Sequence, residues 1–185
     1  RLRNLRLRRK SLFEPLEDRS LMATWTGLGA DGIWNDDMNW GGVAGDTPDT
    51  IGETAVFDNA ALAETITISG PITIGSLTFN GTATGFVINS GASNTFGAIN
   101  HDAVGGANTI NSVIGGASSV AVNNGTLTLG SALNTYTGAT AINNGTLSVA
   151  DLTSSPSSVG ATSAITIGTA GTVGKLQYTG ATDNA

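Results

Sequence analysis

The side chain best suited to acid–base chemistry is His101, the only histidine among the 185 residues. It lies in Asn100-His101-Asp102, and a histidine beside an aspartate is part of a serine-hydrolase triad. The Gly-x-Ser-x-Gly turn that would present a nucleophilic serine is absent, and the chain has no cysteine to replace it. We therefore expect His101 to be a solvated loop residue and not a catalytic base.

A dense group of carboxylates lies between residues 31 and 58. Oxygen ligands of this kind bind Ca²⁺, but the spacing of an EF-hand loop and the Gly-Gly-x-Gly-x-Asp repeat are both missing. We expect solvated loop acids here, with no metal and no cofactor. The group consists of Asp31, Asp36, Asp37, Asp46, Asp49, Glu53 and Asp58.

Carboxylates become sparse after Glu64. Only Asp102, Asp151 and Asp183 remain, with Lys175 as the one basic residue. Glycoside hydrolysis needs two paired carboxylates, and a polysaccharide lyase needs Ca²⁺-binding acids together with a base. We therefore predict that this chain is not an enzyme. A polysaccharide lyase or hydrolase whose site lies outside the given sequence stays open as an alternative.

Three tryptophans, Trp25, Trp34 and Trp40, are all the tryptophan in the chain. They could stack on sugar rings, which would make this segment a carbohydrate-binding module. They could equally be buried as a plug, because large aromatic rings cover apolar surface efficiently. We favour the plug and keep the carbohydrate-binding module as the alternative.

The elements that must position these residues follow a period of two from Glu64 onward. In Thr126–Leu129, for example, apolar Leu127 and Leu129 alternate with Thr126 and Thr128. A strand alternates its side chains between two faces, so the leucines should point inward and the threonines outward. Glycine and asparagine separate the short apolar segments, which is typical of strands joined by turns.

An internal repeat connects these strands. Residues 121–129 align with residues 141–149 at an offset of 20, with six of the nine positions identical, and residues 174–178 form a weaker third copy. A short strand with one apolar face buries that face by stacking on the next coil of a solenoid. We therefore predict that Leu127 stacks on Leu147 and that Thr128 stacks on Ser148.

The segment 124–149 resembles one autotransporter-associated β-strand repeat, which reads Gly-x-Leu-x-Leu, then Asn-x-Tyr-x-Gly-x-Thr, then Gly-x-Leu. This resemblance implies a right-handed parallel β-helix on a secreted or cell-surface bacterial protein, and it brings no catalytic residues. The Trp-rich stretch before the strands is similar to the usual lead-in of such arrays. The matching positions are Gly125, Leu127, Leu129, Asn134, Tyr136, Gly138, Thr140, Gly145 and Leu147.

The N-terminal segment differs from the rest in charge. Residues 1–19 carry a net charge of +4, and the remainder carries −10. A nucleic-acid partner is disfavoured because the acidic body would repel phosphate, so we expect a targeting segment instead. Leu16-Glu17-Asp18-Arg19-Ser20-Leu21-Met22 resembles the Leu-Glu-Pro-Arg-x-Leu-Leu motif near the N-termini of large surface proteins of planctomycete bacteria. Here Asp18 replaces the proline, and Met22 replaces the last leucine.

Three Asn-Gly-Thr sequences, beginning at Asn80, Asn124 and Asn144, match the acceptor pattern for N-glycosylation. Asn-Gly is also a favoured tight-turn pair, because both residues tolerate a positive φ. We favour the turn interpretation.

The sequence as a whole predicts an all-β, right-handed parallel β-helix with a Trp-rich N-terminal cap. We expect a targeting segment over residues 1–23, the cap over 24–63, and about six or seven coils over 64–185. No apolar stretch is long enough for a membrane helix, so we expect no membrane insertion. The predicted function is that of a secreted or cell-surface spacer or adhesin-like passenger. The sequence does not identify the binding partner, for which extracellular glycans and cell-surface components are the candidates.

Overall fold

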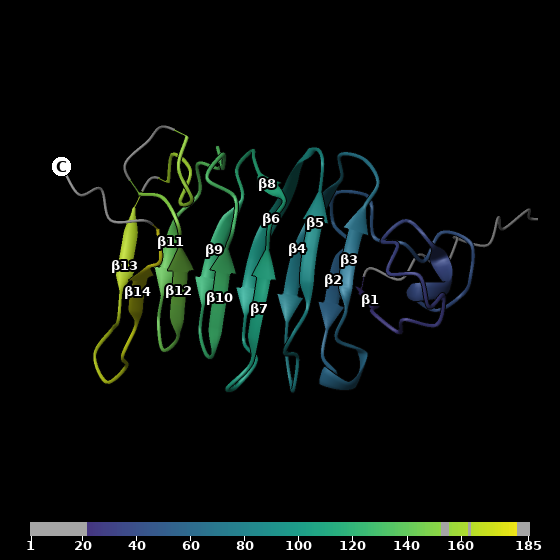
Figure 1. Ribbon diagram of the computed structural model, residues 1–185, viewed down its shortest axis with the longest axis horizontal. Coiled ribbons are helices and arrows are strands. Elements are labelled where there is room, and N and C mark those ends of the chain that lie inside the picture. The colour runs from purple at the N-terminus through teal and green to yellow at the C-terminus, as the bar shows by residue number, and fades with distance from the viewer. Residues whose placement is uncertain (1–21, 153–155, 163, 181–185) are drawn as a thin grey trace, which may run out of the picture.

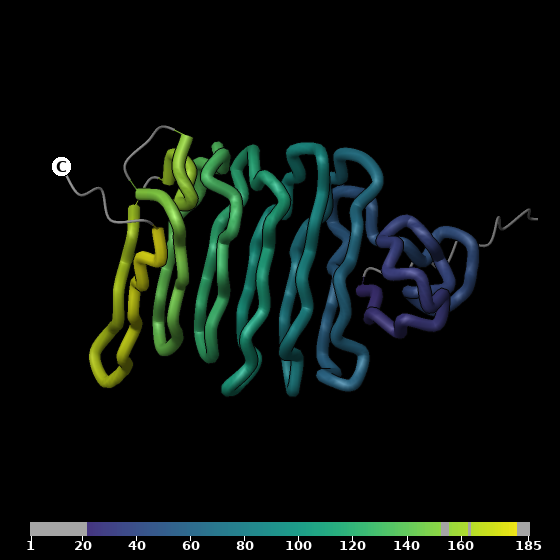
Figure 2. The backbone as a smooth tube through the Cα atoms, viewed as in Figure 1, coloured from purple at the N-terminus to yellow at the C-terminus, as the bar shows by residue number. Residues whose placement is uncertain are grey.

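The computed structural model describes residues 22–152, 156–162 and 164–180. Over these residues the chain forms about five turns of a parallel β-solenoid, which confirms the predicted fold class (Figure 1). All of the paired strands in its sheets run parallel to their neighbours. The turns stack side by side along the long axis, with the N-terminal loops gathered at one end (Figure 2).

Each full turn contributes one strand to each of two sheets. In spatial order, the larger sheet contains β1 (Met22–Thr24), β2 (Thr54–Phe57), β4 (Thr73–Phe79), β6 (Ser93–His101), β9 (Ser119–Val122), β11 (Thr140–Ile142) and β13 (Ile165–Ile167), with β8 (Val113–Ile114) paired to β6. The second sheet contains β3 (Thr65–Ile68), β5 (Val87–Ser90), β7 (Ala107–Ile110), β10 (Thr126–Leu129), β12 (Thr146–Val149) and β14 (Lys175–Tyr178). Two short 3₁₀ helices, η1 (Asp37–Asn39) and η2 (Ala60–Leu62), lie in connecting loops.

The coil length varies along the solenoid. Phe57 pairs with Phe79, and Phe79 pairs with His101, which are steps of 22 residues. The step shortens to 20 where Leu127 pairs with Leu147, and it lengthens to 29 where Leu147 pairs with Leu176. This lengthening is one reason why the chain forms about five turns and not the six or seven expected.

The interior is made of ladders, in which residues from successive coils stack at the same position. The inward residues of both sheets form one hydrophobic cluster. Because each strand alternates its faces, one apolar residue in two is enough to build it. One ladder of the second sheet shows the pattern: Ile66, Ile88, Ile110, Leu129, Val149 and Tyr178.

The predicted alternation of Thr126–Leu129 is confirmed. Leu127 and Leu129 are fully buried, while the two threonines keep partial exposure. Leu127 pairs with Leu147, and Thr128 pairs with Ser148, as the 20-residue offset predicted. Burying a leucine of this kind stabilises the folded chain by roughly 1.5–3 kcal/mol.

The predicted segment boundaries differ from the structure at two places. Met22 and Ala23, assigned to the targeting segment, pair with Thr54 and Ala55 in the larger sheet. The strand β2, assigned to the cap, is already in register with β4 and therefore belongs to the solenoid. Residues 1–21 of the targeting segment lie outside the described residues. None of the described helices is long and apolar enough to cross a membrane.

Candidate functional site

The Trp-rich cap, which we define as Trp25, Trp34, Trp40 and the loops between them, closes the N-terminal end of the interior. The three side chains are 1%, 0% and 4% exposed, so none presents a ring face on which a sugar could stack. Their rings pack edge to face, with centroids 5.0 Å apart for Trp25–Trp40 and 4.7 Å apart for Trp34–Trp40. The rings therefore act as the plug favoured from the sequence.

Every tryptophan N–H of the cap has a partner inside the protein. Trp25 donates to the Glu64 carboxylate at 3.1 Å. Trp34 donates to the carbonyl of Pro48 at 2.9 Å, and Trp40 donates to the carbonyl of Trp34 at 2.7 Å. Buried indoles need such partners, because an unsatisfied donor in an apolar environment is costly.

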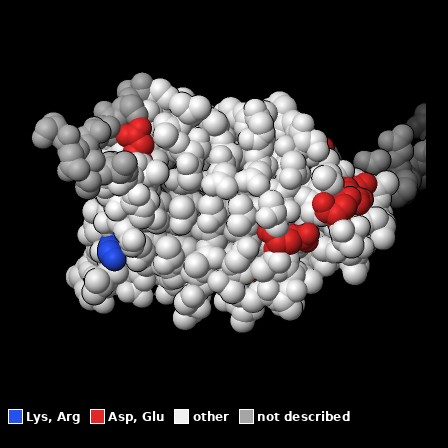
Figure 3. Space-filling view, viewed as in Figure 1, with Lys and Arg blue, Asp and Glu red and all other residues white. Residues whose placement is uncertain are grey.

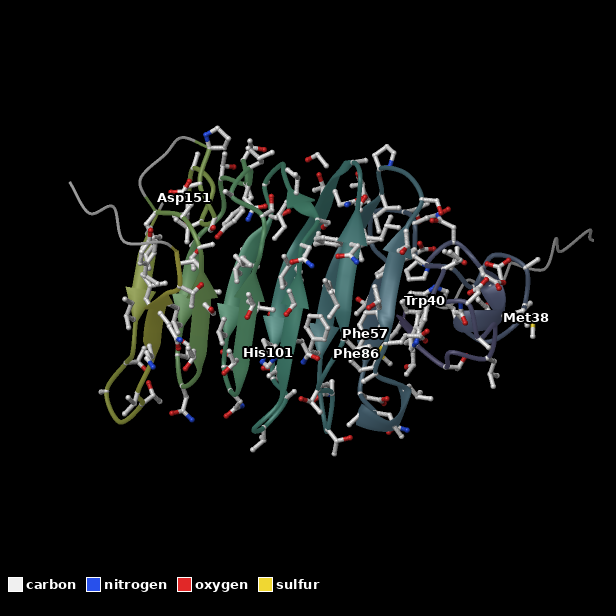
Figure 4. The ribbon with its side chains drawn as sticks, in the orientation of Figure 1. Met38, Trp40, Phe57, Phe86, His101 and Asp151 are labelled. Atoms are coloured by element: carbon white, nitrogen blue, oxygen red, sulfur yellow. The ribbon has the colours of Figure 1, made fainter. Side chains whose placement is uncertain are left out.

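An aromatic column continues from the cap into the coils. Phe57 is its centre, with ring centroids 5.7 Å from Trp25, 5.0 Å from Phe86 and 5.5 Å from Phe79. Figure 4 labels Trp40, Phe57, Phe86 and His101 along this path through the interior. The column ends at His101, whose ring lies 5.6 Å from that of Phe79.

His101 was predicted to be a solvated loop residue, and this was wrong. It is the last residue of β6 and is 0% exposed. Phe79 and Val122 occupy the same inward ladder position in the coils on either side. The flanking polar residues Asn100 and Asp102 resemble a turn in the sequence, but the step of 22 from Phe79 places His101 in the core.

The polar atoms of His101 are satisfied within the core. Nδ1 lies 2.7 Å from the Asn124 carbonyl oxygen, which can only accept, so Nδ1 carries the proton. Nε2 lies 3.1 Å from the Asn108 amide nitrogen and accepts from it. Burial lowers the pKa of His101, while the Asn124 carbonyl and the charge of Asp102 oppose this shift. The ring is therefore buried, and with one nitrogen donating and the other accepting it is the neutral imidazole.

Buried Asn and Ser side chains form a second set of interior polar contacts, which sequence reasoning mostly missed. Each accepts a hydrogen bond from a backbone N–H of the preceding coil. Only Asn134 was singled out, through the repeat motif. The signal for the others is their spacing from the residues they bond, because each donor lies 20 to 22 positions earlier in the chain. The pairs are Asn94 with Ile72 N, Asn108 with Phe86 N, Ser118 with Phe96 N and Asn134 with Ile114 N.

The residues of the predicted repeat motif have structural contacts. Asn134 is fully buried and donates from its amide to the carbonyl of Ser158 at 2.8 Å. The Tyr136 hydroxyl lies 2.9 Å from the Thr140 hydroxyl, and burial raises the pKa of Tyr136. A side chain at Gly138 would collide with the Ser118 carbonyl of the preceding coil. The motif therefore joins consecutive coils.

The acids of the cap were predicted to be solvated, and for the buried Glu53 this was wrong. Asp37 accepts from the backbone N–H groups of Gly45 and Thr47, and from the Thr47 hydroxyl. Glu53 is 6% exposed and accepts from the N–H groups of Asp49 and Thr50. These carboxylates hold the cap loops in place, which the sequence could not indicate because the partners are set by tertiary structure.

Two further cap carboxylates also bond to the loop backbone. Asp31 accepts from Ile33 N, and Asp36 accepts from Met38 N. Hydrogen bonds lower the pKa of Asp31, chiefly the bond from Ile33, and the bond from the Thr47 hydroxyl lowers the pKa of Asp37. Within the described ranges, no group of three or more His, Asp or Glu side chains is placed to hold a metal ion.

The sparse acids of the coils are not brought together. Asp102 follows β6 and accepts from the Asn123 amide, whereas Asp151 follows β12. In Figure 4, Asp151 lies at the upper left of the solenoid, and His101 lies lower and nearer its middle. Lys175 lies in β14, and Asp183 lies outside the described residues. On the face shown in Figure 3, the charged groups lie toward the two ends, with an uncharged surface between them.

The turn interpretation of the Asn-Gly pairs is confirmed at two of the three positions. Gly81 and Gly125 have φ angles of 52° and 60°, in the region that favours glycine. Gly145 has no positive φ, but a side chain there would press on the backbone of Asn124.

Comparisons with known proteins found no match to this chain, whether with protein-family models, with curated proteins or with solved structures.

Proposed function

We propose that this chain is a non-enzymatic structural region of a secreted or cell-surface bacterial protein, where it acts as a spacer or an adhesin-like passenger. The observation that carries the proposal is where the reactive side chains lie. His101 and the three tryptophans are buried in the solenoid and have partners inside it. The described histidine and tryptophans are thus used to join and close the coils.

The resemblance of residues 124–149 to an autotransporter-associated β-strand repeat supports the same proposal. The positions that carry this resemblance make coil-to-coil contacts, such as Leu127 on Leu147 and Asn134 on Ile114. Repeats of this type extend a protein by a fixed rise of about 4.8 Å per coil without requiring any site. A rigid rod of variable length suits a spacer.

The proposed location can be tested with antibodies raised against this chain. They should label intact cells of the source bacterium, and permeabilisation should add little signal. Labelling that appears only after permeabilisation would overturn the proposed surface location, unless the protein is recovered from the culture medium.

A glycan array separates the two proposed roles from the carbohydrate-binding module. A spacer should bind no glycan on the array, and an adhesin-like passenger should bind through an outward face. Trp34→Phe keeps an aromatic ring at this buried position, although it loses the N–H that donates to Pro48, and it tests the cap directly. Binding that is abolished by Trp34→Phe in a folded protein would favour the carbohydrate-binding module over our proposal.

A further inference from the structure

Three turns of the solenoid contain the same tripeptide, Asn-Gly-Thr, beginning at Asn80, Asn124 and Asn144. An asparagine followed by glycine can cyclise, because the glycine N–H meets little steric hindrance when it approaches the asparagine side chain. Since the local sequence is the same at all three places, any difference in their reactivity must come from the fold.

At Asn80 the reacting groups already lie together. The Gly81 backbone nitrogen is 2.8 Å from the Asn80 side-chain oxygen, which is one bond from the carbon that it would attack. Both residues are exposed. Ammonia can therefore leave directly into solvent, and water can reach the site.

The side chains of the other two asparagines bond to backbone groups of neighbouring coils. The Asn124 amide donates to the Asp102 carbonyl at 3.4 Å, and the Asn124 carbonyl accepts from His101. The Asn144 side-chain oxygen accepts from Val173 N at 3.4 Å. Gly145 is buried, and its carbonyl accepts from Lys175 N. Closing a ring at either place would disturb these coil-to-coil contacts.

We propose that Asn80 is a site of spontaneous deamidation in the folded protein, and that Asn124 and Asn144 are protected. The Gly81 nitrogen forms a bond to the Asn80 side-chain carbon, and the side-chain nitrogen leaves as ammonia with the proton from Gly81. Water then opens the cyclic imide to aspartate or isoaspartate. The net change is hydrolysis of one amide, and it requires no oxidant or reductant.

The carboxylate formed at position 80 would be repelled by the carboxylates of the adjacent coils. Asn80 N donates to the Phe57 carbonyl, and Asp102 N donates to the Phe79 carbonyl, so residues 58, 80 and 102 follow one another in successive coils. Residues 58 and 102 are both aspartates. A carboxylate at position 80 would therefore stand between two others at a coil spacing of about 4.8 Å, where like charges repel.

The test is incubation of the folded protein at mildly alkaline pH, followed by acidic digestion and peptide mass spectrometry. Replacement of NH by O should accumulate at Asn80 at least about tenfold faster than at Asn124 or Asn144, because the latter require local opening. In denaturant the three sites should react at similar rates. Asn80→Ser is the control, and it should abolish the fast phase only. Equal rates at the three sites in the folded protein would overturn the proposal, as would faster reaction at Asn124 or Asn144.

Discussion

The residues of the interior ladders are buried at the N-terminal end of the solenoid and partly exposed in the last described coil. At the N-terminal end, Phe57 is fully buried beneath the cap, and Trp34 is fully buried within the cap. At the other end, the ladder residues Ile165, Ile167 and Tyr178 are 41%, 50% and 47% exposed. Their equivalents one coil earlier, Thr140, Ile142 and Val149, are all buried. An inward residue of the described coils is therefore buried only when the cap or an adjacent coil covers it on both sides.

The largest effect should come from a charge placed in one ladder at its two levels. Ile142 and Ile167 pair with each other, but only Ile142 is covered on both sides. Ile142→Asp should destabilise the protein by more than about 4 kcal/mol, because it buries an unpaired carboxylate. Ile167→Asp should cost within about 1 kcal/mol, since its carboxylate stays hydrated. Urea unfolding followed by far-ultraviolet circular dichroism measures both, and equal losses would contradict the comparison.

Removal of an aromatic ring should distinguish the two ends in the same way. Trp34→Ala should cost about 3–5 kcal/mol, because the ring is fully buried and its loss leaves a cavity. Tyr178→Ala should cost about 1 kcal/mol or less, because roughly half of that side chain is in water. The melting temperatures of the two variants check this. A larger loss for Tyr178→Ala would mean that the cap does not close its end.

A smaller effect on stability should come from a change of pH, through His101 in the middle of the solenoid. Burial lowers the pKa of His101 in the folded state, so the unfolded chain, with a pKa of about 6.5, takes up the proton first. The stability due to the neutral ring is thus fully present above about pH 6.5 and is lost as the pH falls below it.

The double variant His101→Phe with Asn108→Leu removes the titrating ring and the amide that donates to it. Phenylalanine extends the stack of Phe57 and Phe79, and leucine matches Leu127 in the next coil. Unfolding free energies measured between pH 7.5 and 5 should fall in the native protein and fall less in the variant. The same pH dependence in both would show that His101 is not its source.

The smallest effect should appear in the cap at lower pH. Hydrogen bonds lower the pKa of Asp31 and Asp37 in the folded protein, so their contribution is present above about pH 4 and is lost as the pH falls further. Tryptophan fluorescence should therefore change below about pH 4 as the cap loosens. Asp37→Asn should weaken this transition. A cap that is unaffected at pH 3 would contradict the assigned role of these carboxylates.

The sequence predicts the stacking of coils where successive coils repeat the same residue types. It does not predict the stacking where only the ladder positions repeat. Leu127 and Leu147 share a visible repeat, so their stacking could be predicted. His101 shares a ladder with Phe57 and Phe79 but differs from them in residue type, and no visible repeat aligns the three positions. The same limit applies to the cap, where Asp37 accepts from Gly45 N and Thr47 N, because these contacts depend on how the connection between β1 and β2 folds back on itself.

Hydrogen exchange along the 185-residue chain tests most directly the claim that the cap closes the N-terminal end, while the inward residues of the last described coil stay partly exposed. We predict strong protection of the amides in β2 and β4 beneath the cap, strong protection through β12, and fast exchange in β13 and β14. Trp34→Ala should then speed exchange in β2 and β4 while leaving β13 and β14 unchanged. Equal protection at the two ends, or faster exchange beneath the cap than at β13 and β14, would contradict the account.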